Sequence, residues 1–342
     1  MAGAIPAIPA PVENPLLQTL SRKEKAHGLA TQGRIVEALS VLNDGISAGD
    51  ADACFLLATW TFSGQIVARN LKIAAELFAK AAENGHPAAE DIHIALLANS
   101  AGGQRDWSRA IHLLERKAGR DPAAAQQLAI LSAIALDTNG DPHELPSFER
   151  LSERPDIVLF PNFLSPEECA YLRETARPHF QSSVVVHPFT GQRFQHPIRT
   201  SDTAIFPLAF ENPAIHALNR RMAAASRTRP EQGEPLQILR YSPGQEYRLH
   251  SDALAGEANQ RTLTMLIYLN DAFEGGETAF PAANIHVRGR QGDAILFRNI
   301  GEDGLPDPLA RHAGKPVFKG TKFVASRWIR RQPLDLTSPS SR

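Results

Sequence analysis

The spacing of hydrophobic positions changes part-way along the chain. From about residue 22 to residue 135, alanine and leucine recur every three or four residues and β-branched runs are few, which predicts helices. Beyond about residue 156 the apolar segments are short and rich in β-branched and aromatic residues. They are separated by turn signals such as SPGQ, EGGET and RGRQGD, a pattern that predicts strands. The chain is therefore expected to have a helical half followed by a mainly β half.

A repeat is visible in the helical half. EALSVLNDGISAGDADA starts at Glu37, AAELFAKAAENGHPAAE at Ala74, and AIHLLERKAGRDPAAAQ at Ala110. A period in the mid-thirties with paired helices indicates an α-solenoid, and Gly85 stands where a helix would end in a left-handed turn. Solenoids expose concave surfaces that suit peptides. The helices are expected either to bind a protein partner or only to pack on the second half of the chain.

The β half is interrupted by two predicted helices. One starts at Ser165-Pro166-Glu167-Glu168, which offers an N-cap, a proline at the first position and acidic first-turn residues; the other covers Pro213 to Ala224. Many short strands after a helical preface favour a double-stranded β-helix of the jelly-roll or cupin type. The predicted strands are IVLFPNFL, LQILRY, TLTMLIYL, NIHVRG, DAILFRN and KFVASRWI.

These patterns together predict an α+β protein with two domains, in agreement with a length of 342 residues. We expect a flexible tail over 1–20, a helical repeat domain over 21–140, and a linker over 141–155 that is rich in Pro, Asp, Ser and Glu. The mainly β domain follows over 156–332, and a second flexible tail covers 333–342.

Charge and cysteine content narrow the possible partners and setting. A formal net charge of −1 supplies no broad basic field, so nucleic acid is not an expected partner. No apolar run approaches the roughly 20 residues that span a bilayer, so no membrane association is expected. The opening segment has no basic stretch before Arg22, and Cys54 and Cys169 form no metal-type or disulfide-type spacing. A cytoplasmic location is the expectation.

Three residues of the β half have the composition of a metal site. His250 and Asp252 are two positions apart, so on a strand both side chains would point to the same face. His-x-Asp alone arises often by chance, but His312 follows some sixty residues later. Two histidines and one carboxylate form the facial triad of non-heme iron(II) enzymes, which leaves coordination positions open for cosubstrate and O₂. A structural zinc site would need a fourth ligand, usually cysteine.

Lys322 lies ten residues beyond His312 and supplies a second signal. A 2-oxoglutarate (2OG) molecule that chelates iron through its keto acid needs a cation for its distal carboxylate. Lys322, Val324, Ser326 and Trp328 share one parity and hence one face of a predicted strand. An exposed lysine is the ordinary alternative, but the histidine upstream favours the functional interpretation.

From about Ile157 to Arg331 the chain resembles the prolyl 4-hydroxylase family of iron/2OG dioxygenases. The resemblance is carried by an ordered series of motifs: FLSPEEC near Phe163, IRTSD at Ile198, LQILRYSPGQEYRLHSD ending at Asp252, TLTMLIYLND at Thr262, EGGETAFP at Glu274, GDAILF at Gly292 and HAGKPVFKGTKFVASRWI from His312. The middle of the helical half, LFAKAAENGHPAAE, resembles a Sel1-like repeat, a relative of the tetratricopeptide repeat.

The resemblance implies a role for each candidate residue. It implies iron ligation by His250, Asp252 and His312, which are then the catalytic centre, and pairing of Lys322 with the distal carboxylate of 2OG. Ascorbate is implied as the reductant that rescues oxidised iron. The cosubstrate pocket would be lined by Tyr241, Thr264 and Tyr268, and the peptide would be recognised by Arg199, Tyr247, Arg261 and Trp328.

Three functions remain open at this point. The first is hydroxylation of prolyl residues in a peptide or protein, with succinate and CO₂ as coproducts. The second keeps this chemistry but uses a free amino acid or another small metabolite as substrate. The third is a repeat-based adaptor whose oxygenase domain is inactive, although all four key residues are present.

Overall fold

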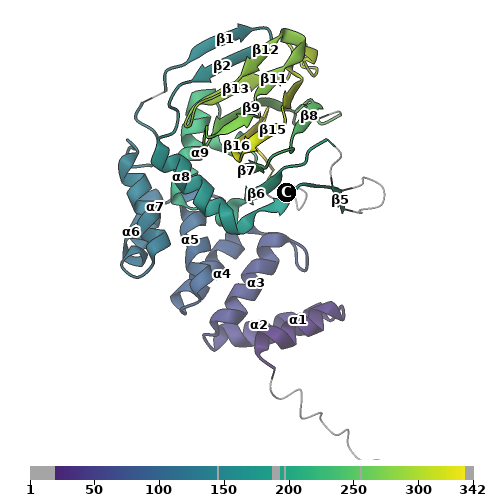
Figure 1. Ribbon diagram of the computed structural model, residues 1–342. Helices are drawn as coiled ribbons and strands as arrows, with labels where there is room; N and C mark the ends of the chain where they lie inside the picture. The colour runs from purple at the N-terminus through teal and green to yellow at the C-terminus, as the bar shows by residue number, and fades with distance from the viewer. Residues whose placement is uncertain (1–19, 145, 187–192, 196–197, 255, 336–342) are drawn as a thin grey trace, which may run out of the picture. The chain divides into compact units, whose positions relative to one another are not determined.

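The computed structural model describes residues 20–144, 146–186, 193–195, 198–254 and 256–335 (Figure 1). The chain divides into two compact units, Met1–His93 and Ile94–Arg342. The two predicted tails fall outside the described residues except for Leu20 and residues 333–335. No helix in the described ranges is long and apolar enough to cross a bilayer.

The first unit is helical. Two of its helices start at polar caps: the side chains of Asp50 and Asn70 accept hydrogen bonds from backbone N–H groups in the first turns of the helices that follow. Gly85 has φ +88°, so the predicted left-handed turn is confirmed. The assignment to Sel1-like repeats stays a prediction. The helices are α1 (Arg22–Thr31), α2 (Ile35–Ser47), α3 (Ala51–Ser63), α4 (Leu71–Glu83) and the first half of α5 (Pro87–Asn99).

The second unit combines the remaining helices with the strands. Ser165 forms the predicted capping box with Glu168 at the start of α8, and the predicted helix at Pro213 is also present. Trp107 and Leu114 are buried in the same apolar cluster as Leu172 of α8. The division by packing therefore differs from the boundary expected at residue 140, because α6 and α7 share a core with the sheet. Besides the second half of α5, the helices of this unit are α6 (Trp107–Ala118), α7 (Pro122–Ala133), α8 (Pro166–Ala176) and α9 (Pro213–Ser226).

In the described part of the chain the main sheet has eight strands, and its pairs are antiparallel. Its order is β1-β2-β13-β9-β16-β7-β6-β3. The strands are β1 (Glu149–Glu153), β2 (Asp156–Phe160), β3 (Gln181–Ser182), β6 (Asp202–Phe206), β7 (Leu236–Tyr241), β9 (Arg261–Tyr268), β13 (Ala294–Arg298) and β16 (Lys322–Arg330).

A smaller antiparallel sheet faces it, in the order β12-β11-β14-β8. These strands are β8 (Tyr247–His250), β11 (Thr278–Phe280), β12 (Ile285–Val287) and β14 (His312–Gly314). Two further pairs join β4 (Val184–Val186) to β5 (Arg193–Gln195) and β10 (Phe273–Gly275) to β15 (Val317–Gly320). Short 3-10 turns lie at Arg177–His179, Leu208–Phe210, Pro230–Gln232, Pro281–Ala283 and Pro308–Ala310.

One part of the expected linker is a strand. β1, with the sequence ERLSE, pairs antiparallel with β2 at the edge of the main sheet. Its residues are mostly exposed, so it has no apolar alternation from which a strand could be predicted. Residues 149–153 of the expected linker over 141–155 therefore form an edge strand, held by backbone pairing with β2 and by an ion pair between Arg150 and Asp156.

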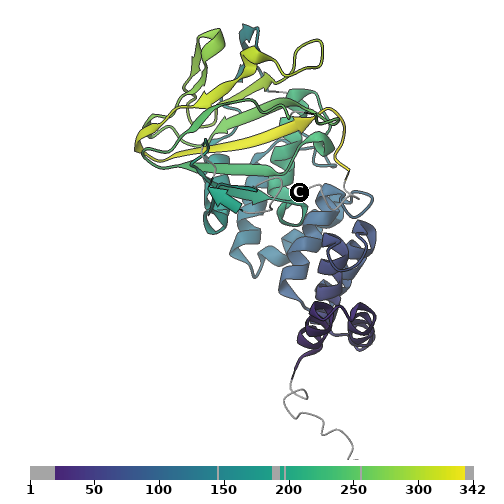
Figure 2. The same cartoon turned by 90° about the vertical axis from the view of Figure 1, so that its right-hand side faces the viewer.

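The main sheet separates two apolar layers, as alternate positions of β9 make clear. Met265 and Ile267 are buried in the cluster that includes the helices, whereas Tyr268 is buried with Phe280 of the smaller sheet. The long strand β16, yellow in Figure 2, runs through the sheet between β9 and β7. Polar residues of β9 and β16, among them Thr264 and Lys322, are on the second face of this sheet, toward the smaller sheet.

Candidate metal and cosubstrate site

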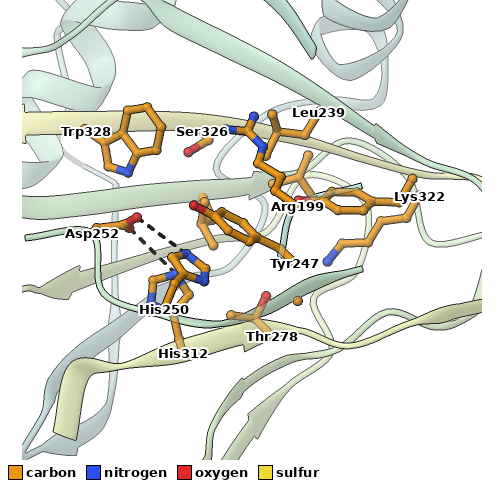
Figure 3. Close-up of a pocket in the computed structure, with 14 residues that line it drawn as sticks. Arg199, Leu239, Tyr247, His250, Asp252, Thr278, His312, Lys322, Ser326 and Trp328 are labelled. Carbon is orange, nitrogen blue, oxygen red and sulfur yellow. Dashed lines mark ion pairs between the residues drawn. The ribbon is translucent and has the colours of Figure 1, made fainter. Parts of the chain in front are cut away.

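His250 and His312 are directly opposite each other in the smaller sheet. His250 ends β8 and His312 begins β14, and the register of this antiparallel pair places the two residues side by side. Asp252 lies between their imidazoles, with Oδ1 at 3.6 Å from His250 Nε2 and Oδ2 at 3.7 Å from His312 Nε2 (Figure 3). One atom from each residue lies within 4.8 Å of the others. In the part of the chain that the structure describes, this is the one His/Cys/Asp/Glu group with such spacing.

The backbone position of Asp252 differs from the expected one. The strand ends at His250, so Asp252 lies in the bend that follows rather than two positions along the same strand. The side chain nevertheless converges on the two imidazoles, and its Oδ2 accepts a hydrogen bond of 2.7 Å from the hydroxyl of Thr264 on β9.

The hydrogen bonds of both histidines select one tautomer. His250 Nδ1 is 2.7 Å from the carbonyl oxygen of Arg248, and His312 Nδ1 is 3.1 Å from that of Ala310. Because a carbonyl oxygen only accepts, each Nδ1 carries the proton. The lone pair of each neutral ring is therefore on Nε2, the atom that faces Asp252, as in a metal-ligating histidine held by a backbone carbonyl.

The site is buried, and burial sets its charge state. Burial lowers the pKa of His312 to about 4, only partly offset by Asp252, so this imidazole is neutral at physiological pH. Burial alone would raise the pKa of Asp252, but the two imidazoles and the Thr264 hydroxyl outweigh it and hold that pKa below its usual range. Two imidazoles and one carboxylate are the donor set that suits iron(II), so these residues fit the metal.

Lys322 is a buried cation in the same pocket. It begins β16 opposite Tyr241 of β7, and its side chain is 4% exposed. Its Nζ donates to the carbonyl oxygen of Gly276 at 2.6 Å and lies 5.5 Å from the ring centroids of Tyr241 and Tyr268. Burial lowers the pKa of Lys322 to about 8, with Glu277 opposing that change. An ammonium has three N–H donors, so two remain for an anionic ligand.

The expected face of β16 is confirmed by the pocket lining. Lys322, Val324, Ser326 and Trp328 all line the pocket. Lys322 lies on the opposite side of it from Asp252 and Trp328 (Figure 3). The indole nitrogen of Trp328 is buried and has no hydrogen-bond partner among the described residues. The pocket thus has a metal-type end and a cationic end.

The three residues predicted to line the cosubstrate pocket have different surroundings. Tyr241 lines the pocket, and Tyr268 lies under Lys322 with its hydroxyl bonded to that of Thr278 at 2.8 Å. Thr264 instead bonds Asp252 on one side and Asn299 on the other. Its predicted contact with the cosubstrate stays a prediction.

The four residues predicted to recognise the peptide fall into two groups. Arg199, Tyr247 and Trp328 line the pocket. Tyr247 stacks on His250 with ring centroids 3.5 Å apart, and the Arg199 guanidinium lies 5.4 Å from the Tyr247 centroid. Arg261 is not part of this lining. Its guanidinium lies 3.7 Å from the Trp328 ring centroid and bonds Glu234 through two nitrogens at 2.6 and 2.7 Å, so it contacts the site through Trp328.

Two contributing residues were not singled out from the sequence. Gly276 gives its carbonyl to Lys322, and a Cβ at this position, where φ is +69°, would lie 3.2 Å from the Lys322 side chain. The EGGET segment carried a signal for this, since paired glycines indicate close approach of the backbone. Asn299, which bonds Thr264, follows β13 and carries no sequence signal of its own.

Comparison with known proteins agrees with this geometry. Residues 236–330 match the family model of the 2OG-Fe(II) oxygenase superfamily. The chain is 41% identical over 204 residues to Prolyl 4-hydroxylase 1 of Arabidopsis thaliana, a match that covers 54% of this chain and 72% of that protein. The chain belongs to the prolyl 4-hydroxylase family of 2OG-Fe(II) oxygenases. Probable prolyl 4-hydroxylase 3 of the same plant is 37% identical over 205 residues, covering 53% of this chain and 71% of that relative.

The solved structures include a viral collagen prolyl hydroxylase from Paramecium Bursaria Chlorella virus-1 in its 2OG complex. It is 27% identical, has a TM-score of 0.42, and covers 51% of this chain and 95% of its own. As a member of the prolyl 4-hydroxylase family, this chain is a 2OG-dependent dioxygenase whose cofactors are Fe(II) and 2OG. Its mainly β part, with antiparallel sheets, has the fold of that family, and helices precede it.

Proposed function

We propose that this dioxygenase hydroxylates prolyl residues within a peptide or protein. The observation that carries the proposal is the pocket itself, in which a two-histidine, one-carboxylate group and a buried lysine lie opposite each other beside Tyr247 and Trp328. Its relatives named as prolyl 4-hydroxylases support the choice of proline. Aromatic walls suit the apolar ring of proline, and the Arg199 side chain offers N–H donors for peptide carbonyls.

His250, Asp252 and His312 would hold the iron, which when bound supplies the activation of O₂ that is coupled to oxidation of 2OG. The overall reaction consumes substrate, O₂ and 2OG, and yields hydroxylated substrate, succinate and CO₂. Lys322 binds the distal carboxylate of 2OG by charge-assisted hydrogen bonds. Leu239, Leu266 and Val324 line the space between the two ends with apolar surface that excludes water.

The remaining proposals concern the surroundings of the reaction. Ascorbate would serve as reductant, and the N-terminal helices would hold a protein partner in the manner of Sel1-like repeats. A cytoplasmic setting is supported by the two cysteines, Cys54 and Cys169, which are both free thiols.

The test is a substrate panel assayed with Fe(II), 2OG and ascorbate. Peptides that contain proline are compared with the same peptides carrying alanine there and with free proline, and products are analysed for the mass of one added oxygen atom. Oxygen addition to the prolyl peptide alone, with matching succinate release, supports the proposal. Hydroxylation of the free amino acid but not of peptides would favour the small-metabolite function. Absence of 2OG turnover with every substrate, including substrate-free turnover, would favour the adaptor.

A further inference from the structure

A buried chain of two side-chain hydrogen bonds ends on the carboxylate of the metal site. The Thr264 hydroxyl is 2.7 Å from Asp252 Oδ2, and Asn299 Nδ2 is 2.9 Å from Thr264 Oγ1. The exposed fractions of Asp252, Thr264 and Asn299 are 5%, 0% and 2%. Water therefore does not compete with these bonds, and losing one would leave a buried polar group without its partner.

The direction of the chain follows from its chemistry. An ionised carboxylate only accepts, so the single hydroxyl proton of Thr264 points to Asp252. The oxygen of that hydroxyl is then left to accept, which is why the amide nitrogen of Asn299 must face it. The backbone of Asn299 is held by two hydrogen bonds. Its N–H donates to Thr262 O at 2.9 Å, and its carbonyl accepts from Asp307 N at 3.0 Å.

Asp252 needs such support more than the two histidines do. His250 and His312 are on paired strands, and the Nδ1 atom of each is held by a backbone carbonyl. Asp252 lies beyond the end of β8, in a bend. Its two oxygens lie 3.6 and 3.7 Å from the Nε2 atoms of the two imidazoles; these atoms carry lone pairs and donate no hydrogen bond to the carboxylate, so a donor from elsewhere is required to fix its rotation.

We propose that Thr264 and Asn299 are positioning residues for the metal: Asn299 orients the Thr264 hydroxyl, and this hydroxyl holds one oxygen of Asp252 so that the carboxylate is presented in one orientation. This role differs from the contact with 2OG that the sequence predicted for Thr264. The inference rests on the proposed metal binding at the same site.

The first test is the metal affinity of Thr264→Val, which removes the hydroxyl but keeps the β-branched shape. Titration of the metal-free protein with Co(II), followed by its visible absorption, is expected to show an affinity lower by about 10- to 100-fold. Thr264→Ser restores the hydroxyl and is expected to restore affinity. Thr262→Val is the matched control on the same strand, because the Thr262 hydroxyl bonds Ile329 O and not the site. Its affinity should equal that of the unaltered protein.

The second test separates the metal from the cosubstrate. At saturating Fe(II), Thr264→Val is expected to leave the KM for 2OG unchanged. An unchanged Co(II) affinity together with a raised KM for 2OG would overturn the proposal in favour of the cosubstrate contact.

The third test examines whether Asn299 acts through Thr264. Asn299→Leu removes the amide at similar volume and is expected to weaken Co(II) binding several-fold. Because its effect passes through the hydroxyl, the double variant should bind Co(II) as weakly as Thr264→Val alone. If the losses of Co(II) affinity in the two single variants add in the double variant, Asn299 does not act through Thr264. If Thr264→Val does not fold, the other two variants test the proposal. It requires weaker Co(II) binding in Asn299→Leu and near-normal Co(II) binding in Thr264→Ser.

Failure of this inference is distinguishable from failure of the proposed function. If the unaltered chain binds neither Co(II) nor Fe(II), the metal site itself is refuted. If it binds metal and Thr264→Val binds equally well, only the positioning role is refuted.

Discussion

The two ends of the pocket are stabilised in opposite ways. At the metal end the carboxylate of Asp252 has a neighbouring imidazole on either side and a hydroxyl donor, so the chain itself favours its charged form. At the other end the charged form of Lys322 is disfavoured by burial, and its ammonium donates a hydrogen bond to the backbone carbonyl of Gly276. The metal end is therefore organised in advance, whereas the cationic end gains its stabilisation when an anion arrives.

The largest effect is expected from Asp252→Ala. Removing the carboxylate leaves two imidazoles and no anionic ligand to hold a dication, so metal binding and 2OG turnover should both be lost. Coupled measurement of succinate release and Fe(II) retention checks this. Full activity in this variant would rule out the triad.

Lys322→Ala tests the cationic end by itself. A charge-assisted pair contributes about 1.5–3 kcal/mol, so the KM for 2OG should rise by roughly 10- to 150-fold, since about 1.4 kcal/mol corresponds to a factor of ten. Co(II) affinity should not change, because Lys322 does not belong to the metal group.

Lys319→Ala is the control for this variant. Lys319 is exposed, and its ion pair with Glu274 lies on the surface, so its removal should leave the KM for 2OG as it was. A rise in that KM equal to the rise in Lys322→Ala would show that general positive charge, rather than the buried ammonium, attracts 2OG.

The effect of pH on 2OG affinity is expected to be smaller than the effect of Lys322→Ala. With a pKa of about 8, Lys322 is about nine-tenths charged at pH 7 and about one-tenth charged at pH 9, so affinity should fall roughly tenfold between them. The folded chain loses this proton before the unfolded chain does, and the contribution of Lys322 to the free energy of unfolding therefore rises with pH from about 8 upward. Deprotonation of Lys322 therefore does not unfold the protein between pH 7 and 9, and a loss of 2OG binding in that range is not explained by such unfolding.

Lys322→Arg is the variant that checks the cause. A guanidinium stays protonated throughout this pH range, so the decline between pH 7 and 9 should disappear even if the KM at pH 7 is altered. Persistence of the same decline would assign it to another group.

The smallest effect is expected from Tyr268→Phe. It removes the hydroxyl that bonds Thr278 and leaves the ring under Lys322. The free energy of unfolding should fall by about 1 kcal/mol, and the KM for 2OG should change only a few-fold. Chemical denaturation and steady-state kinetics measure the two effects, and a change as large as that of Lys322→Ala would give the hydroxyl a direct role in binding 2OG.

Sequence patterns predicted the elements in which local and tertiary signals agree. LQILRY is β7 to the residue, because its apolar residues, including the adjacent Ile238 and Leu239, are buried on both faces of a central strand. The capping box at Ser165 is a local motif and was confirmed. β1 could not be predicted, since its exposed polar residues are ordered only by pairing with β2.

In the site, too, features with a local sequence signal could be predicted, and features that depend on tertiary contacts could not. The face shared by Lys322 and Trp328 follows from strand parity and was predicted. The surroundings of Thr264 could not be predicted in this way. Parity gives the face on which its side chain lies, but its partners Asp252 and Asn299 come from a bend and from another strand end.

The pairing of His250 with His312 links the chemistry of the site to the folding of the smaller sheet. These residues lie on neighbouring strands but are separated by some sixty positions along the chain, so an ion bound to both closes a long loop that the unfolded chain does not close. A ligand that binds only the folded state at a hundred times its Kd adds about 2.7 kcal/mol to the free energy of unfolding. Iron supply would then affect the stability of the folded protein in the cell as well as the rate of the reaction that it catalyses.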